Sequence, residues 1–264
     1  MARSVPRLVV VVLALLAGRC LAAEGVRLDY DVRYGPVSIL AIRTSAWIAG
    51  ERYQTESRMQ TEGVIGYFFP WHADARSQGT ITGDAWKPEH HRLSGAYRSE
   101  RRSVAIDYDG GTVRAQVLPP PEDDYRTQVP PALQQGTMDP LTASLAAVGT
   151  DCRGTLHVFD GRRRYDMVLS DLGAADLKRS RHGVYAGPTR RCRAEVRPVA
   201  GFWDRKPGDD DPENDEEPAH LDFWIAQPRP DVRAVPVYLE LSGARGTLSI
   251  WLRAAEPLTS PPAG

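Results

Sequence analysis

The chain is dominated by a two-residue alternation of apolar and polar positions. Side chains of a β-strand point alternately to the two faces of a sheet, so this period indicates strands with one buried and one wetted face. Such a pattern is typical of antiparallel sheet rather than of buried parallel strands. We count roughly ten to fourteen candidate strands between Val26 and Arg253. The clearest alternation occurs in Val104–Tyr108, Leu156–Val158, Leu221–Ile225, Val235–Leu241 and Leu248–Leu252.

Glycine-containing turn sequences separate these segments. Asp109-Gly110-Gly111 and Asp160-Gly161 are typical of tight hairpins, and Gly243 to Gly246 separates the last two strands. The 23 glycines and 21 prolines favour strands and turns over a helical bundle. The predicted fold class is therefore all-β and mainly antiparallel. We expect a single domain over residues 24–255, followed by a flexible tail over 256–264.

One segment has a helical pattern instead, and it follows a proline-rich connector at residues 119–131. Asp139 is a suitable N-cap and Pro140 suits the first turn of a helix. An apolar stripe follows at helical spacing, formed by Met138, Leu141, Leu145 and Val148. We expect one short helix over 139–148, lying across the sheet. Its structural role would be to plug the open side of a curved sheet, and its functional role would be that of a movable lid over a cavity.

The N-terminus has the pattern of a secretory signal peptide. Arg3 and Arg7 precede an apolar run from Leu8 to Ala17, and small residues follow at positions 22 and 23. Because a hydrocarbon core of about 30 Å requires roughly 20 apolar residues, this run is too short to span it. We expect residues 1–23 to be cleaved on export, leaving no transmembrane segment in the mature chain. The alternative keeps Cys20 as a lipidated first residue, but Arg19 stands where that processing requires a small residue.

Removal of this leader changes the charge of the chain. The leader holds three of the 33 basic residues and none of the 34 acidic ones, so the mature chain has a formal charge near −4. This mild acidity gives no broad attraction to nucleic acid, and we expect no nucleic-acid partner. Seven acidic residues lie between Asp209 and Glu217. A calcium loop would need a glycine within that run, so we expect residues 206–218 to form a solvated, disordered loop.

Cleavage also leaves only two cysteines, Cys152 and Cys192. In an exported chain, such a pair is best explained by one disulfide. Closing a loop of about 40 residues would stabilise the fold by roughly 4 kcal/mol. A redox pair or half of a metal site is the alternative, but the sequence has no Cys-x-x-Cys motif and no histidine pair beside either cysteine.

Several of these residues resemble a known family, domain of unknown function 3108, which comprises exported bacterial envelope proteins. The similarity covers about residues 30–252, and the acidic run at 209–217 departs from the family pattern. It implies a periplasmic protein with a strongly curved sheet or half-open β-barrel, similar to the half-barrels of lipoprotein-carrier and lipoprotein-receptor proteins. No catalytic residue is defined for the family. The resembling segments are Met138-Asp139-Pro140-Leu141, Cys152-Arg153-Gly154, Phe159-Asp160-Gly161-Arg162-Arg163-Arg164-Tyr165-Asp166, Cys192, Val235-Pro236-Val237 and Gly246-Thr247-Leu248.

An aromatic cluster provides the first candidate site. Residues 67–71 contain too many adjacent aromatic residues for all of them to share one face of a strand. In a half-barrel, Tyr67, Phe68, Phe69 and Trp71 would line the mouth of an apolar cavity. Alternatively, the second face of the strand packs beneath the helix or a long loop.

Arginine groups provide the second candidate site. Arg162, Arg163 and Arg164 follow a hairpin glycine, whereas Arg190, Arg191 and Arg193 flank Cys192. If the disulfide brings these groups together, six guanidinium groups would surround a phosphate or carboxylate, such as a lipid headgroup or a sugar phosphate. The alternative is ion pairing on a wetted face with Asp160, Asp166 and Glu195. A third group, Arg98, Arg101 and Arg102, lies on another predicted hairpin.

The sequence carries no recognisable catalytic, cofactor or metal motif. The six histidines are scattered, and adjacent His90 and His91 would point to opposite faces of a strand. We therefore expect no cofactor and no metal, and a non-enzymatic envelope protein that binds a lipid-like or acyl ligand in the concave face of its sheet. Two alternatives stay open. One is an interaction protein with a filled core and an envelope protein partner, and the other is an envelope-polymer hydrolase that uses strand carboxylates such as Asp29, Asp31 and Asp107.

Overall fold

A single antiparallel sheet of 13 strands forms the body of the protein, as seen in the computed structural model, which describes residues 24–120, 128–202, 220–243 and 246–261. The first seven strands are β1 (Glu24–Tyr34), β2 (Val37–Ala49), β3 (Arg52–Thr61), β4 (Trp71–Thr82), β5 (Ala85–Tyr97), β6 (Glu100–Asp109) and β7 (Thr112–Leu118). The other six are β8 (Gly154–Phe159), β9 (Arg164–Leu177), β10 (Gly187–Ala200), β11 (His220–Ala226), β12 (Val235–Gly243) and β13 (Gly246–Leu258). The helices are α1 (Gly63–Phe68), α2 (Pro131–Gln134) and α3 (Pro140–Gly149).

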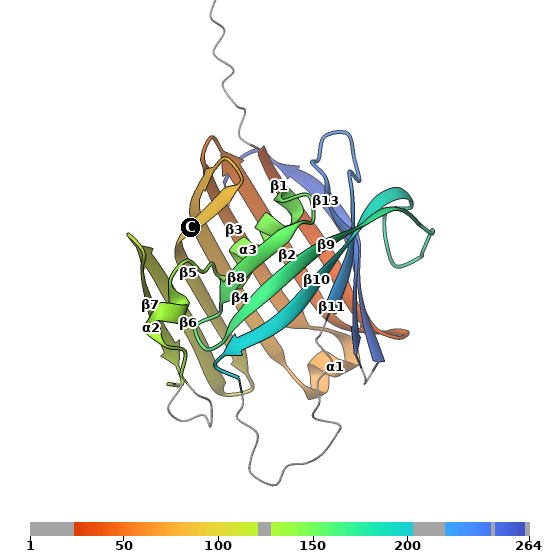
Figure 1. Cartoon of the computed structure of the whole chain (residues 1–264). Helices are drawn as coiled ribbons and strands as arrows, with labels where there is room; N and C mark the ends of the chain where they lie inside the picture. Colours follow the sequence, from red (N-terminus) through yellow and green to blue (C-terminus); the bar gives the residue numbers. More distant parts are fainter. Residues whose placement is uncertain (1–23, 121–127, 203–219, 244–245, 262–264) are drawn as a thin grey trace, which may run out of the picture.

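The sheet consists of two meanders joined by the first and last strands. Its order is β7-β6-β5-β4-β3-β2-β1-β13-β12-β11-β10-β9-β8, so every neighbour except the β1–β13 pair is also a neighbour in sequence. The sheet curls until the two meanders face each other, with α3 between them (Figure 1). Strands β7 and β8 do not pair, so the barrel is half-open. The predicted all-β, strongly curved antiparallel sheet is therefore confirmed.

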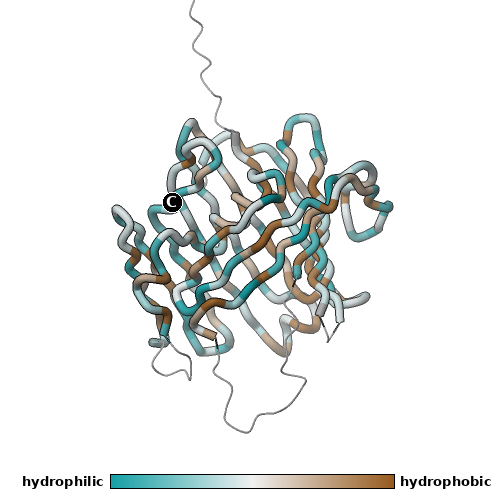
Figure 2. Tube along the Cα trace, in the orientation of Figure 1, coloured by the Kyte–Doolittle hydropathy of each residue, from teal (hydrophilic) through white to brown (hydrophobic). Residues whose placement is uncertain are grey.

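The alternating pattern places one face of each strand inside the curl. On β1, Val26, Leu28 and Val32 are buried and point to the concave face. The alternation of apolar and polar residues can be followed along β9 and β10 in Figure 2. Because strand side chains alternate, the concave face carries the apolar set and the convex face carries most of the charged residues.

Helix α3 fills the space between the two meanders. Ala143, Ala146 and Ala147 are buried against Leu156 and Phe223 of the second meander, and the helix also contacts β3, β4 and β5 of the first. Small side chains face the tightest contacts, whereas the predicted stripe residues Leu141, Leu145 and Val148 are only half-buried. The stripe prediction was therefore wrong in detail, since a helix enclosed on two sides is buried most deeply where its residues are smallest. The arrangement is that of a plug.

The open side of the barrel is bridged by packing rather than by a strand ladder. Met138 forms a single parallel bridge with Val158 on β8. Ile106, Val129 and Phe159 form a separate buried cluster that joins β6 to β8. A Cβ at Gly161, in the β8–β9 turn, would lie 2.6 Å from Cγ1 of Val104. The two free edges of the sheet are therefore held together by side-chain contact near this turn.

The element boundaries differ from the predictions in three places. The predicted helix over 139–148 is confirmed as α3, but α1 and α2 were not expected. Strand β13 continues to Leu258 and pairs with Gly25, so the ordered domain extends three residues beyond the expected boundary. The predicted signal peptide at 1–23, the whole acidic loop at 206–218 and the last residues of the tail lie outside the described residues.

The predicted disulfide between Cys152 and Cys192 is present, with a Cα–Cα distance of 5.7 Å. Both cysteines are fully buried in the core beside α3. Because Cys152 precedes β8 and Cys192 lies on β10, the bond spans β9 and fixes the end of α3 to the second meander.

We expect the Cys152→Ala/Cys192→Ala double variant to unfold at a lower denaturant concentration than the native chain. Loss of the 40-residue loop closure lowers the free energy of unfolding by about 3 to 4 kcal/mol in the chain-entropy treatment. Equilibrium guanidinium denaturation followed by tryptophan fluorescence measures the change. An unchanged midpoint would show that the crosslink contributes nothing to stability.

Candidate functional site

Exposed apolar side chains gather at one end of the barrel. Eight of the eleven large exposed hydrophobic residues lie at the end where β1, β3, β5 and β7 finish. Six of them are neighbours on the β1–β2 hairpin and on α1, and we call this set the apolar end. Its members are Tyr34, Val37, Val64, Tyr67, Phe68 and Phe69, with Tyr67 82% exposed and Val64 70% exposed. Single exposed apolar residues are ordinary, but a contiguous group of this kind is a candidate contact surface.

Helix α1 carries three members of the apolar end on a short protrusion, and its C-cap Phe69 is a fourth. Gly63 begins the helix with a φ of +59°, and the Gly66 amide donates to the Glu62 carbonyl at 2.9 Å. A Cβ at Gly66 would lie 2.7 Å from the Thr61 carbonyl oxygen, so this close turn requires glycine. None of the helix residues is buried. The helix therefore presents its side chains to solvent.

The hydroxyl group of Thr61 helps to fix the protrusion to the sheet, together with the Glu62 amide, which donates to the Ile39 carbonyl at 3.3 Å. Thr61 Oγ1 donates to the Phe69 carbonyl at 2.9 Å and accepts from the Trp71 amide at 3.0 Å. The two rings of Tyr67 and Phe68 meet edge to face, with centroids 5.1 Å apart. The backbone that carries the aromatic cluster is thus hydrogen-bonded to the sheet, and two of its exposed rings contact each other.

Positive charge lies beside the apolar end. The amide of Arg98, in the β5–β6 turn, donates to the Pro70 carbonyl at 3.3 Å, and the Arg98 guanidinium lies 5.4 Å from the ring centroid of Tyr97. Arg101 and Arg102 follow on β6 and are exposed. The aromatic protrusion and a basic turn therefore share the same end of the barrel.

The location of the predicted aromatic site differs from the expectation. Tyr67 and Phe68 lie on a helix rather than a strand, because Gly63, Gly66 and Pro70 interrupt the extended conformation. Tyr67, Phe68 and Phe69 are exposed at the end of the barrel, and Trp71 begins β4. Tyr67, Phe68 and Phe69 do not line the concave face, where α3 lies, whereas Trp71 is half-buried on the same side of β4 as Ala73 and Ala75.

The two predicted arginine groups are not brought together. Arg164 pairs with Ala200 across the β9–β10 ladder, whereas Arg193 lies seven residues earlier on β10, which places the groups roughly 20 Å apart along the strand. The disulfide joins Cys192 to Cys152 and not to the β8–β9 turn that holds Arg162, Arg163 and Arg164. A single anion cannot contact all six guanidinium groups.

Most of these arginines form ion pairs or hydrogen bonds within the protein. Arg163 and Arg164 contact Asp160 and Asp166 at 2.9 and 2.8 Å, as the ion-pairing alternative expects. The other expected acceptor, Glu195, contacts Arg197 at 2.7 Å instead. In the remaining contacts, Arg162 donates to the Pro119 carbonyl, Arg190 pairs with Asp151 and Asp171, and Arg191 and Arg193 share Asp222.

A buried polar network surrounds the first turn of α3. The Asp139 carboxylate has no exposed surface and accepts from the Leu141 and Thr142 amides, each at 3.0 Å. Ser77 Oγ and Thr142 Oγ1 each donate to it at 2.6 Å. His91 Nδ1 lies 3.1 Å from the same carboxylate. Every contact joins the helix to β4 or β5 or caps the helix itself.

This network contains a serine, a histidine and an aspartate, but its geometry is not that of a proton relay. In a Ser-His-Asp triad, serine and aspartate contact opposite nitrogens of the imidazole. Here Ser77 Oγ and Asp139 Oδ1 both approach Nδ1 of His91, at 2.8 and 3.1 Å. All three side chains are also buried. The network therefore acts as a structural anchor for α3.

Burial alone would raise the pKa of Asp139, but hydrogen bonds and the charge interaction with His91 outweigh it and hold the pKa below its usual value. A carboxyl whose folded-state pKa is depressed stabilises the fold above its unfolded-state pKa of about 4, and this stabilisation is lost as the pH falls through the folded-state value. The anchor is therefore expected to weaken in acid.

We expect Asp139→Asn to lower the free energy of unfolding by about 2 kcal/mol at neutral pH, because the buried donors lose a charged acceptor. The difference from the native protein should shrink as the pH falls below about 4. Denaturant unfolding at a series of pH values measures both effects. Asp107→Asn is the matched control, since Asp107 contacts His90 Nδ1 at 2.7 Å on the exposed face, and it should change stability by less than about 1 kcal/mol. A constant difference across the acid range would contradict the assignment.

The described residues contain neither a metal cluster nor a spanning helix. No group of three or more histidine, cysteine or acidic residues in the described ranges is placed to hold a metal ion. No helix in the same ranges is long and apolar enough to cross a bilayer. The strand carboxylates considered for hydrolysis are each held by a cation, Asp29 by Arg43, Asp31 by Arg33 and Asp107 by Arg92.

Two features of the site were missed from the sequence. The buried positions of Ser77 and His91 carry polar residues at alternation sites that normally hold apolar ones, and this departure was the only local signal of a network. The helical protrusion at 63–68 was signalled by Gly63 and Gly66 flanking two β-branched residues. A helix of six residues is too short for periodicity to identify.

Comparison with known proteins gives a family and a structural neighbour. The family described as "Protein of unknown function (DUF3108)" matches residues 29–250, which confirms the resemblance found in the sequence. No curated protein matches the chain. A beta-barrel-like protein of domain of unknown function DUF1849 from Brucella abortus superposes with a TM-score of 0.48 at 10% sequence identity, covering 90% of this chain and 98% of that chain.

Proposed function

The chain belongs to this family of proteins of unknown function, and we propose that it is an exported, non-enzymatic envelope protein that binds the surface of a lipid bilayer through its apolar end. The observation that carries the proposal is the clustering of exposed aromatic and aliphatic side chains on α1 and the adjacent β1–β2 hairpin. The signal-peptide pattern at residues 1–23 supports export to a compartment bounded by membranes.

The form of the apolar end favours a lipid surface over a protein partner. A stable protein interface needs a broad, well-packed patch with a buried centre. Here the apolar residues protrude on a six-residue helix with no buried member. A narrow protrusion can insert between lipid headgroups, where the apolar ring and polar hydroxyl of Tyr67 are both accommodated and the rings of Phe68 and Phe69 bury apolar surface.

The neighbouring charges also fit a bilayer surface. Arg98, Arg101 and Arg102 lie beside the aromatic protrusion, where their guanidinium groups would meet headgroup phosphates. The connection from β10 to β11 starts and ends at this same end of the sheet, and its sequence carries eight acidic residues. We therefore expect zwitterionic bilayers to be bound at least as well as strongly anionic ones.

The packed interior supports a role for the outer surface rather than for the concave face. The space in which a lipid or acyl ligand was first expected holds α3, which contacts both meanders. Tyr53 Oη and Thr142 Oγ1 are 2.8 Å apart and buried, so the helix is bonded to the sheet as well as packed against it. Release of this plug would break a buried polar network.

We expect the mature protein to sediment with phosphatidylcholine vesicles and Phe68→Asp to bind them at least tenfold more weakly, because a carboxylate on the protrusion opposes insertion. Vesicle co-sedimentation gives the partition coefficient. Val184→Asp is the matched control. Val184 is a 58% exposed residue on the β9–β10 loop, beside Leu252 in the middle of β13 and outside the apolar end.

Equal loss of binding in both variants would contradict a role for the apolar end. Absence of vesicle binding by the native protein, together with a partner captured at Tyr67 by site-specific photo-crosslinking in native envelopes, would favour the protein-interaction alternative instead. Circular dichroism verifies that each variant keeps its strand content.

A further inference from the structure

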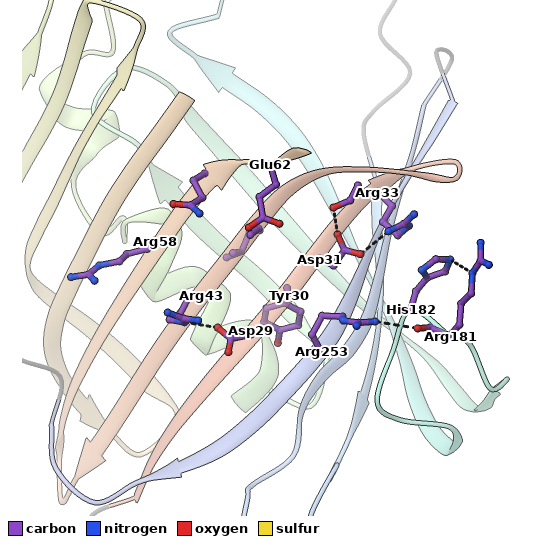
Figure 3. A pocket seen from close by; sticks show the side chains of 14 residues that line it. Asp29, Tyr30, Asp31, Arg33, Arg43, Arg58, Glu62, Arg181, His182 and Arg253 are labelled. Atoms are coloured by element: carbon purple, nitrogen blue, oxygen red, sulfur yellow. Dashed lines mark hydrogen bonds and ion pairs between the residues drawn. The ribbon is translucent and has the colours of Figure 1, made fainter. Parts of the chain in front are cut away.

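A second surface feature lies on the convex wall of the barrel, beside the apolar end but sharing none of its residues. It is a cleft of about 740 Å³ over the outer face of β1, β2 and β13. The β9–β10 loop closes one side, pinned to β13 by the Val184 amide, which donates to the Leu252 carbonyl at 3.0 Å. Figure 3 shows Arg253 and the loop residues Arg181 and His182 on this side of the cleft, opposite Asp29 and Arg43.

Positive side chains outnumber negative ones around this cleft. Five arginines line it, against three carboxylates. Two of those carboxylates are already neutralised, Asp29 by Arg43 at 2.6 Å and Asp31 by Arg33 at 2.9 Å. Among the described residues, Arg181 and Arg253 have no carboxylate partner, and Arg253 Nη1 donates only to the Arg181 carbonyl at 3.1 Å. Two guanidinium groups are therefore available to a ligand.

The backbone of β13 turns Arg253 toward the cleft. Asp29 of β1 pairs with Ala254 and Tyr30 pairs with Leu252, so Arg253 is the extra residue of a β-bulge. A bulge re-aims the side chain of the extra residue, and bulges occur often beside functional sites. Leu252 is buried on the concave side, so the residue that follows it on the strand faces the convex wall and the cleft. Arg253 is therefore both the extra residue of the bulge and an arginine with no carboxylate partner among the described residues.

We propose that this cleft binds a phosphate group, with the guanidinium groups of Arg181 and Arg253 as its main ligands. Guanidinium groups match the oxygens of phosphate in charge and in donor geometry. The ligand is a phosphomonoester or inorganic phosphate, and its source is either a soluble metabolite or a lipid headgroup. The site shares no residue with the apolar end, so it does not rest on the bilayer proposal.

His182 provides a local reporter for this site. Burial and the guanidinium groups of Arg33, Arg181 and Arg253 lower the pKa of His182, against the opposing charge of Asp31. An anion bound beside these guanidinium groups favours the imidazolium form, so the pKa of His182 should rise when phosphate binds. A bound phosphate is therefore expected to offset part of the lowering of the His182 pKa that the arginines cause.

The test is titration of the mature protein with inorganic phosphate at constant ionic strength, followed by calorimetry and by NMR of the His182 ring. We expect saturable binding together with a rise in the pKa of His182. Arg181→Gln/Arg253→Gln should weaken binding by tenfold or more, because charge-assisted hydrogen bonds are lost. Arg114→Gln is the matched control, since Arg114 is exposed on the edge strand β7. It should bind phosphate as the native protein does.

The outcomes separate this site from the apolar end and identify the source of the phosphate. Phe68→Asp should keep full phosphate binding, even if it loses vesicle binding. Displacement of phosphate by vesicles containing phosphatidic acid, whose headgroup is a phosphomonoester, in the native protein but not in Phe68→Asp, would assign the site to a lipid headgroup. Displacement by glycerol 3-phosphate but not by vesicles would assign it to a soluble phosphoester. No saturable binding, or an equal loss in Arg114→Gln, would overturn the proposal.

Discussion

The buried carboxylate of Asp139 is the interaction on which the arrangement of the two meanders depends. It caps α3 through the Leu141 and Thr142 amides and joins the same helix to Ser77 on β4 and His91 on β5. A buried charge is costly unless its hydrogen bonds are complete. The position of α3 is therefore specified by the need to satisfy one side chain, and the small residues of the helix then determine how closely the walls approach.

Filling the interior in this way has a consequence for function. A half-barrel with an empty concave face offers a ligand pocket. In this protein, α3 fills that space, and the side chains that could contact a ligand lie on the outer surface. The apolar residues of α1 protrude from one end, and two arginines without a carboxylate partner in the described residues border a cleft on the convex wall. Both regions are held by contacts to the sheet, through Thr61 in one case and Val184 in the other. The barrel thus acts as a rigid support for surface sites.

The sequence predicted the parts of the fold that depend on local pattern. Alternation in β6, β8 and β11 to β13, the turns at Gly110 and Gly161, and the Asp139 cap all have local causes, and all were found. Proximity across the sheet has no such signal. The separation of Arg164 from Arg193 follows from the β9–β10 register. The convergence of Ser77, His91 and Asp139 depends on the curvature of the whole sheet. The bulge at Arg253 depends on the register between β1 and β13, in which this residue has no partner.

The pairing of β1 with β13 sets the order in which the molecule can be completed. Each meander has neighbours close in sequence, but the seam between them joins Gly25 to Leu258, near the two limits of the ordered chain. Contacts of such long separation form late, because the loop that they close is long. Strand β1 cannot pair with β13 before β13 has been synthesised, so the barrel cannot be completed earlier. The topology therefore leaves the seam between the meanders open until the last strand of the sheet has been synthesised.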